Sequence, residues 1–144
     1  MTSAEYLDLL KQNIAKAQRS IRLVLSSLSD FTPYSPDYDY TDKELEPYDA
    51  LSDRFMRAIE TCLKCFRTYE LYLYAENSSS LRDILQRMEK HSVISSVDKW
   101  FEMRDLRNRL VHDYLPEQLA QMYTLISTPF AAEFRYVEKQ LERV

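Results

Sequence analysis

One polar stretch late in the chain, residues 104–114 with the sequence RDLRNRLVHDY, contains residue types that can hold a phosphate and move a proton. It holds three arginines and one of the two histidines of the chain, and it ends in a tyrosine. Arginine binds phosphate oxygens in fork geometry and offsets developing negative charge. Histidine exchanges protons near neutral pH. Such a set can cleave RNA without a metal ion, because a base activates the 2′-hydroxyl and an acid protonates the leaving 5′-oxygen.

The spacing of these residues limits how they can meet. On one straight helix over residues 96–112, Arg104, Asn108 and His112 would form a single polar stripe. Arg107 precedes His112 by five positions, so the two side chains would point about 140° apart on that helix. We therefore expect one of two arrangements. Either the helix ends before His112, or two copies of the chain bring the stripe to a shared cleft across a two-fold axis.

If the cluster is functional, each polar residue has an expected role. Arg104, Asn108 and Arg109 would hold RNA phosphates, and Asn108 could instead orient the imidazole. Tyr114 would stack on a base or donate a hydrogen bond to a phosphate. The chemistry requires no metal ion and no cofactor.

A purely structural role is the alternative for the same residues. The arginines would then form a solvated helix face, paired with the neighbouring acidic residues Glu102 and Asp105. His112 would cap the end of the helix. Structural ion pairs perturb charged groups as often as functional sites do, so composition and spacing leave both interpretations open.

The composition predicts an all-helical domain around this stretch. The 144-residue chain contains no glycine, which helices tolerate but tight hairpins and phosphate-binding loops do not, because they need positive φ angles. A P-loop or a dinucleotide fingerprint is therefore excluded. The net charge of −4 argues against a broadly basic, nucleic-acid-coating surface but leaves room for a local basic site. The length predicts one domain over residues 1–144.

Apolar residues that recur at three- and four-residue steps locate the expected helices. These span residues 4–28 with Ser3 as the cap, 48–75, 81–90, 96–112, and a stretch from Pro116 that Pro129 interrupts before a last helical piece. Short connections between them predict an up-and-down bundle of four to five helices. Residues 29–47 break the pattern with three prolines, four aspartates and four aromatic residues. We expect a loop there, with its tyrosines either buried or exposed.

No segment reads as an export signal or a membrane anchor. The first residues are charged and lack an apolar core, and no apolar run approaches the roughly 20 residues that a membrane span needs. We therefore expect a cytoplasmic protein that does not associate with membranes.

Cys62 and Cys65 lie inside an apolar stripe, so we expect buried core residues rather than a disulfide or a zinc site. The aspartate-rich loop over residues 29–47 lacks the ligand spacing and the glycine of a calcium-binding loop. We expect it to dock a basic partner rather than to bind a divalent cation.

Residues 107–114, RNRLVHDY, have the form R-N-x-x-x-H-x-Y. This form resembles the R-x4-H-x-Y signature of HEPN-domain ribonuclease toxins of the HepT-like group. The chain length, the helical pattern and the late position of the signature, with 30 residues after it, are also similar to that family. Residues 53–73, DRFMRAIETCLKCFRTYELYL, resemble the second helix of the family.

The resemblance implies a function and assigns roles. Members of the family are helical bundles that dimerise with the signature facing a shared cleft, where they cut RNA without a metal ion. Arg107 and His112 would match the catalytic residues, and Asn108 the polar residue that often follows the arginine. Tyr114 would match a tyrosine to which a minimal nucleotidyltransferase antitoxin adds AMP. The added anion would silence RNA binding by clash and repulsion. The implied partners are RNA, that antitoxin and a second copy of the chain.

A non-catalytic alternative follows from the same resemblance. Some relatives of these toxins are described as substrate-binding partners of a nucleotidyltransferase, and the chain is similar to those as well. The acidic composition and the tyrosine–aspartate loop fit this alternative. The chain has no nucleotidyltransferase signature of its own, which would be Gly-Ser followed by paired acidic residues. The two interpretations share one partner and differ in whether this chain cuts RNA.

Overall fold

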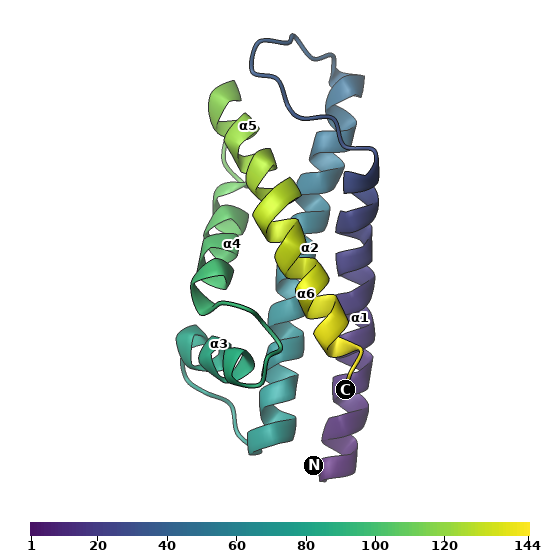
Figure 1. Cartoon of the computed structure of the whole chain (residues 1–144), viewed down its shortest axis with the longest axis vertical. Helices are drawn as coiled ribbons and strands as arrows, with labels where there is room; N and C mark the ends of the chain where they lie inside the picture. The colour runs from purple at the N-terminus through teal and green to yellow at the C-terminus, as the bar shows by residue number, and fades with distance from the viewer.

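A computed structural model describes all 144 residues and shows an all-helical bundle without strands. The helices are α1 (Ser3–Ser29), α2 (Asp42–Tyr74), α3 (Leu81–Lys90), α4 (Val97–Arg109), α5 (Pro116–Leu125) and α6 (Ala131–Leu141). The long helices α1 and α2 lie antiparallel, α3 and α4 pack beside α2, and the α5–α6 arm crosses in front (Figure 1). The expected all-α, up-and-down bundle is confirmed. No helix combines the length and apolar character needed to cross a membrane.

Capping boxes fix the beginnings of both long helices. Thr2, not the expected Ser3, caps α1: its hydroxyl accepts a hydrogen bond from the Glu5 amide, and the Glu5 carboxylate accepts one from the Thr2 amide. Thr41 and Glu44 repeat this pattern at α2. The expectation that residues 29–47 are all loop is therefore wrong at its end. Pro47 lies inside α2, in its second turn, where it has no amide to donate to the Lys43 carbonyl four residues back; the capping box nevertheless fixes the start of the helix upstream of it.

Pro129, which we expected to interrupt the last helical stretch, widens the helix there without ending it. Between α5 and α6 lies a π-helical segment, Ile126–Phe130, which contains Pro129. The amide of Ala131 donates to the carbonyl of Ile126, five residues back. The wider turn accommodates the missing amide of the proline and keeps Ile126 and Phe130 in the core.

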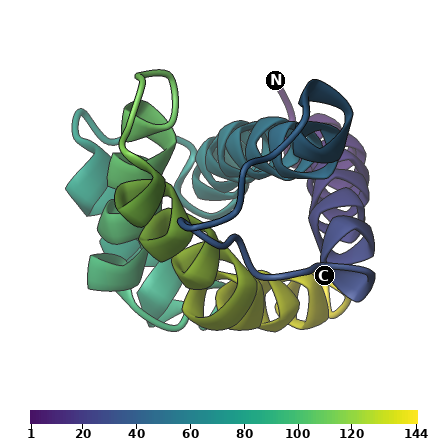
Figure 2. The same cartoon turned by 90° about the horizontal axis from the view of Figure 1, so that it is seen from above.

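Tyrosine rings anchor the α1–α2 loop, residues 30–41, which crosses the end of the bundle toward α5 and returns to α2 (Figure 2). The ring of Tyr34 stacks on Tyr40 at 4.8 Å and lies 5.2 Å from Tyr48 and 5.7 Å from Tyr123 of α5. The Tyr48 hydroxyl donates to the Thr32 carbonyl at 2.6 Å, and burial raises the pKa of Tyr48, so it stays a donor. We call residues 30–41 the tyrosine loop.

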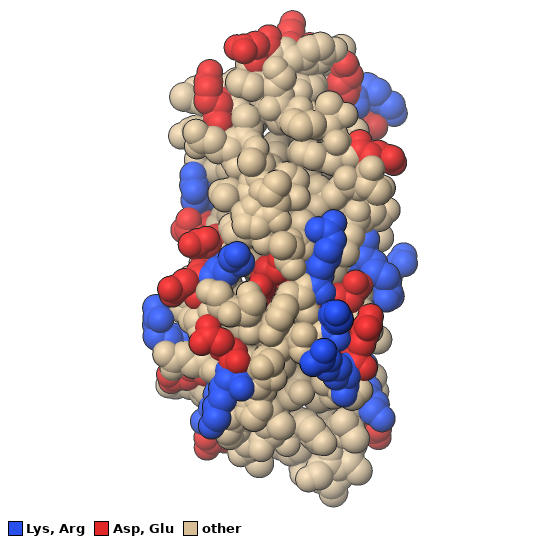
Figure 3. Space-filling model, in the orientation of Figure 1, with Lys and Arg blue, Asp and Glu red and all other residues tan.

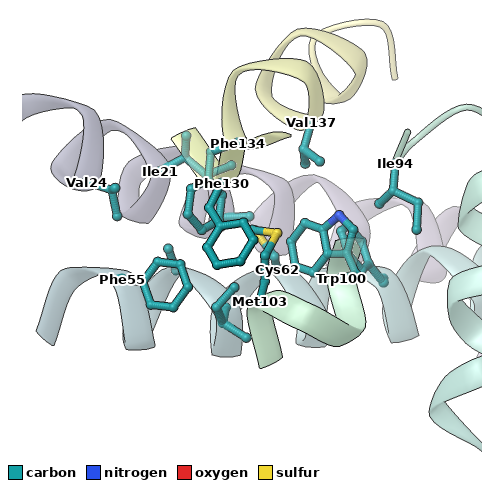
Figure 4. Packing of buried hydrophobic residues seen from close by; sticks show 14 of the residues in the cluster. Ile21, Val24, Phe55, Cys62, Ile94, Trp100, Met103, Phe130, Phe134 and Val137 are labelled. Atoms are coloured by element: carbon teal, nitrogen blue, oxygen red, sulfur yellow. The ribbon is translucent and has the colours of Figure 1, made fainter. Parts of the chain in front are cut away.

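Aromatic side chains from α2, α4 and α6 dominate the core (Figure 4). The single tryptophan, Trp100, is 1% exposed and meets Phe66 edge-on at 5.0 Å and Phe134 at 6.2 Å. Cys62 and Cys65 are free, buried thiols, as expected. Burial raises the pKa of Cys65 to about 12, so it has no thiolate character near neutral pH.

The anchoring of the tyrosine loop should depend on pH through Glu44. Its carboxylate accepts hydrogen bonds from the Tyr38 hydroxyl at 2.5 Å and from the Thr41 amide at 3.0 Å, and these bonds lower its pKa. A carboxyl with a lowered folded pKa stabilises the fold above its unfolded pKa, and this contribution is lost as the pH falls through the folded pKa. We therefore expect the loop to loosen below about pH 4. Hydrogen exchange of the loop amides measures this, and Glu44→Gln should remove the acid transition. An identical transition in that variant would assign the effect to another carboxyl.

Candidate functional site

The signature residues lie at the carboxyl-terminal end of α4 and in the loop to α5. The expectation of one helix over residues 96–112 is right at its start, where Ser96 caps α4, and wrong in its last turn, because α4 ends at Arg109. Residues 111–113 are all exposed, so no packing holds a further turn. His112 lies in the loop, with its amide donating to the Arg109 carbonyl at 3.1 Å. The helix thus ends before His112, which is one of the two expected arrangements.

Arg107 is oriented by two neighbours on its own chain. Its guanidinium forms an ion pair with Glu60 of α2 and donates a hydrogen bond to the side-chain oxygen of Asn108 at 2.9 Å. The Arg107 side chain is 35% exposed and the Glu60 side chain 56% exposed. An exposed ion pair of this kind contributes little stability, so a phosphate could take the place of Glu60 at small cost.

The other signature residues form a looser group around Arg107. The Arg109 guanidinium lies 5.6 Å from the ring centre of Tyr114 and pairs with Asp105 at 3.9 Å. Tyr114 is half-buried against the core. The imidazole of His112 is exposed and forms no hydrogen bond or ion pair, and exposed Arg104 forms no ion pair.

The structure therefore brings some predicted residues together and leaves others apart. Arg107 contacts Asn108, and Arg109 contacts Tyr114. Arg107 and His112 share no hydrogen bond within one chain. The structural alternative holds for the Arg109–Asp105 pair, whereas the carboxylate partner of Arg107 comes from α2 rather than from its own helix. His112 does not cap α4 with its side chain, and its imidazole stays open to solvent.

An uncharged surface borders the signature loop. Residues 118–132, covering most of α5, the π-helical segment and the start of α6, contain no charged side chain. The space-filling view shows a broad area free of charge over α5 (Figure 3). Val111 and Leu115 of the signature loop are 68% and 65% exposed, and Leu125 of α5 is 39% exposed. We call residues 118–132 together with Val111 and Leu115 the α5 face; exposed apolar side chains beside a polar site are typical of a protein-binding surface.

Two features of the molecule were missed by sequence reasoning. Glu60 holds Arg107 from 47 positions away, and no local pattern marks such a pair. A cavity of about 840 Å³ lies between the end of α1, the tyrosine loop and the start of α2. The concentration of aromatic residues in that loop was its only signal. No group of three or more His, Cys, Asp or Glu side chains is placed to hold a metal ion.

The protein is an all-helical bundle. Its signature presents arginine, histidine and tyrosine side chains beside the uncharged α5 face. Over residues 11–143 the chain matches the family described as nucleotidyltransferase substrate binding protein like, and it belongs to that family. This family is related to HEPN-like all-helical domains. The match covers nearly the whole bundle, including the tyrosine loop and the signature. The comparison with curated proteins found no match.

Proposed function

We propose that this protein is the substrate-binding partner of a separate nucleotidyltransferase. The observation that carries the proposal is the family match over residues 11–143. The chain contains no glycine, so it cannot supply the Gly-Ser pair of a nucleotidyltransferase signature. Catalysis of nucleotidyl transfer must therefore come from the partner, and this chain binds or presents the group that is modified.

The α5 face and the signature loop suit that role. The apolar side chains of Val111, Leu115 and Leu125 offer a dry contact area for the partner. Tyr114 lies within the same loop, and the Arg109 guanidinium over its ring is placed to meet the phosphate of an incoming nucleotide. In this proposal the partner docks on the α5 face and reaches Tyr114 as its acceptor.

Leu115→Glu should weaken association with the nucleotidyltransferase at least tenfold, because it places a charge in the proposed contact area. The partner to co-express is the nucleotidyltransferase encoded beside this protein, and co-purification followed by titration calorimetry measures binding. Leu73→Glu is the matched control, since Leu73 is also an exposed leucine but lies near the far end of α2 (Figure 1). Equal binding by the two variants would remove the α5 face as the docking site. A partner that does not bind the wild-type chain would remove the proposed function.

A second candidate function is a metal-independent ribonuclease. The observation that favours it is the arrangement of Arg107 and His112: one is oriented by Glu60 and Asn108, and the other is exposed with no structural partner. A homodimer that faced two signature loops toward each other would supply both groups to one RNA phosphate. AMP on Tyr114 would then place an anion beside the cleft and block RNA.

A further inference from the structure

The cavity beside the tyrosine loop is walled by aromatic rings. Phe31, Tyr38 and Tyr40 line it from the loop, and Tyr48 lines it from α2. Its volume of about 840 Å³ lies within the range of small-molecule sites. The cavity is distinct from the signature, none of whose residues lines it.

The hydroxyl groups of these tyrosines are already used within the protein. Tyr38 donates to Glu44, Tyr48 donates to the Thr32 carbonyl, and the Tyr40 oxygen accepts from the Ser35 amide at 2.9 Å. These bonds hold the rings in place before any ligand arrives. A ligand in the cavity therefore meets tyrosine rings that are already fixed, and the ring face of tyrosine attracts cations.

The charge around the cavity is strongly negative. Residues 30–49 contain seven acidic side chains and one lysine, a net charge of −6, whereas the whole chain carries −4. The rest of the protein is therefore slightly positive, and the acidic character is concentrated at this end, where several red side chains lie around the top of the molecule in Figure 3. Helix α1 also ends here, without a basic residue in its last turn to offset its negative dipole end.

The one basic side chain in the cavity wall, Arg54, does not reverse this charge. It donates through one nitrogen to the Leu23 carbonyl at 3.1 Å and to the Ser27 hydroxyl at 2.9 Å, which holds it against the end of α1. Both acceptors are neutral, so the guanidinium keeps its positive charge, but residues 30–54, which include it, still carry a net charge of −6. Asp30, also in the wall, forms no ion pair within the protein, so its carboxylate can pair with a bound cation.

We propose that this cavity binds a small organic cation, with an ammonium group against the tyrosine rings and paired with the Asp30 carboxylate. Fixed aromatic rings together with a free carboxylate form the recognition set that ammonium ions prefer. The inference goes beyond the proposed function, in which the acceptor is Tyr114. Binding of the cation itself needs no nucleotidyltransferase.

Titration calorimetry of the full chain with spermidine and with tetramethylammonium tests the proposal, with AMP as the anionic probe. We expect both cations to bind, AMP not to bind, and added salt to weaken the binding. Asp30→Asn and Tyr38→Ala should each weaken binding roughly tenfold. The matched controls are Asp98→Asn, an exposed aspartate at the start of α4, and Tyr72→Ala, an exposed tyrosine near the far end of α2. Both controls should bind as the wild type does.

Equal weakening by Asp30→Asn and Asp98→Asn would mean general attraction to an acidic protein and would overturn the site. Binding of AMP in place of the cations would overturn the ligand class. If a lysine-containing peptide binds through Asp30 and Tyr38 but spermidine does not, the site recognises a lysine of a partner protein instead of a small molecule. This result would also overturn the proposal. The titration uses this chain alone, so its failure leaves partner association untouched. A failed association with the nucleotidyltransferase likewise leaves the cation site standing.

Discussion

Replacing Glu133 with alanine should lower the free energy of unfolding by about 2–4 kcal/mol. Glu133 is 3% exposed on α6, and its carboxylate accepts hydrogen bonds from the Trp100 indole at 2.8 Å and from the Ser95 amide at 3.0 Å. It also bonds the Ser95 hydroxyl. Removing the carboxylate leaves the buried Trp100 indole without a partner, frees the more exposed Ser95 donors and opens a cavity between α4 and α6. Denaturant unfolding measures the change through Trp100, the only tryptophan.

Two variants separate the buried hydrogen bonds from the loss of a charge. Glu102→Ala removes an exposed glutamate from α4 and should change stability by no more than about 0.5 kcal/mol. Glu133→Gln keeps one acceptor oxygen but turns an amide NH₂ toward a donor, so its cost should lie between the two. If Glu133→Ala costs no more than Glu102→Ala, the link between α4 and α6 does not depend on this side chain.

Local sequence signals located most of the helices for a physical reason. Ser96 at the start of α4, Pro116 at the start of α5 and the apolar spacing of α3 act over three or four residues, which is the distance that helix formation itself depends on. The predicted start of α2 is wrong because the prolines up to Pro47 indicated a loop, whereas the Thr41–Glu44 capping box starts the helix upstream of Pro47. The end of α4 was misplaced because it depends on packing that the spacing of polar residues does not reveal.

The candidate site was predictable in its residue types but not in its contacts. The signature selected Arg107, Asn108 and His112, and in the structure Arg107 bonds Asn108 whereas the His112 side chain bonds neither. Nothing local marks Glu60 as the partner of Arg107, or Glu133 as buried, since glutamate is ordinarily exposed and pairs across the chain only after folding. The cavity under the tyrosine loop likewise arises only when that loop folds back over α1 and α2.

The test of the ribonuclease candidate should have the largest effect on function. If the wild-type chain cuts RNA, His112→Ala should lower cleavage by about 10²–10⁴-fold, because it removes the group that transfers the proton. The imidazole has no structural partner, so the variant should stay folded. Growth after expression of the chain alone and an RNA cleavage assay in EDTA measure the effect. His91→Ala is the matched control, since the other histidine bonds Tyr74 at the end of α3 and should be dispensable for cleavage.

A mixture of two inactive variants would show how the pair assembles. If each cleavage site takes Arg107 from one chain and His112 from its partner, a heterodimer of Arg107→Ala and His112→Ala chains contains one site with both residues intact. Each heterodimer should then show about half of the wild-type activity, so an equimolar mixture that exchanges subunits freely should reach about a quarter of it, which neither variant shows alone. Activity in the wild type without recovery in the mixture would place the pair within one chain. A harmless wild type that cleaves no RNA would leave nucleotidyltransferase partnership as the function, because association through the α5 face requires neither residue.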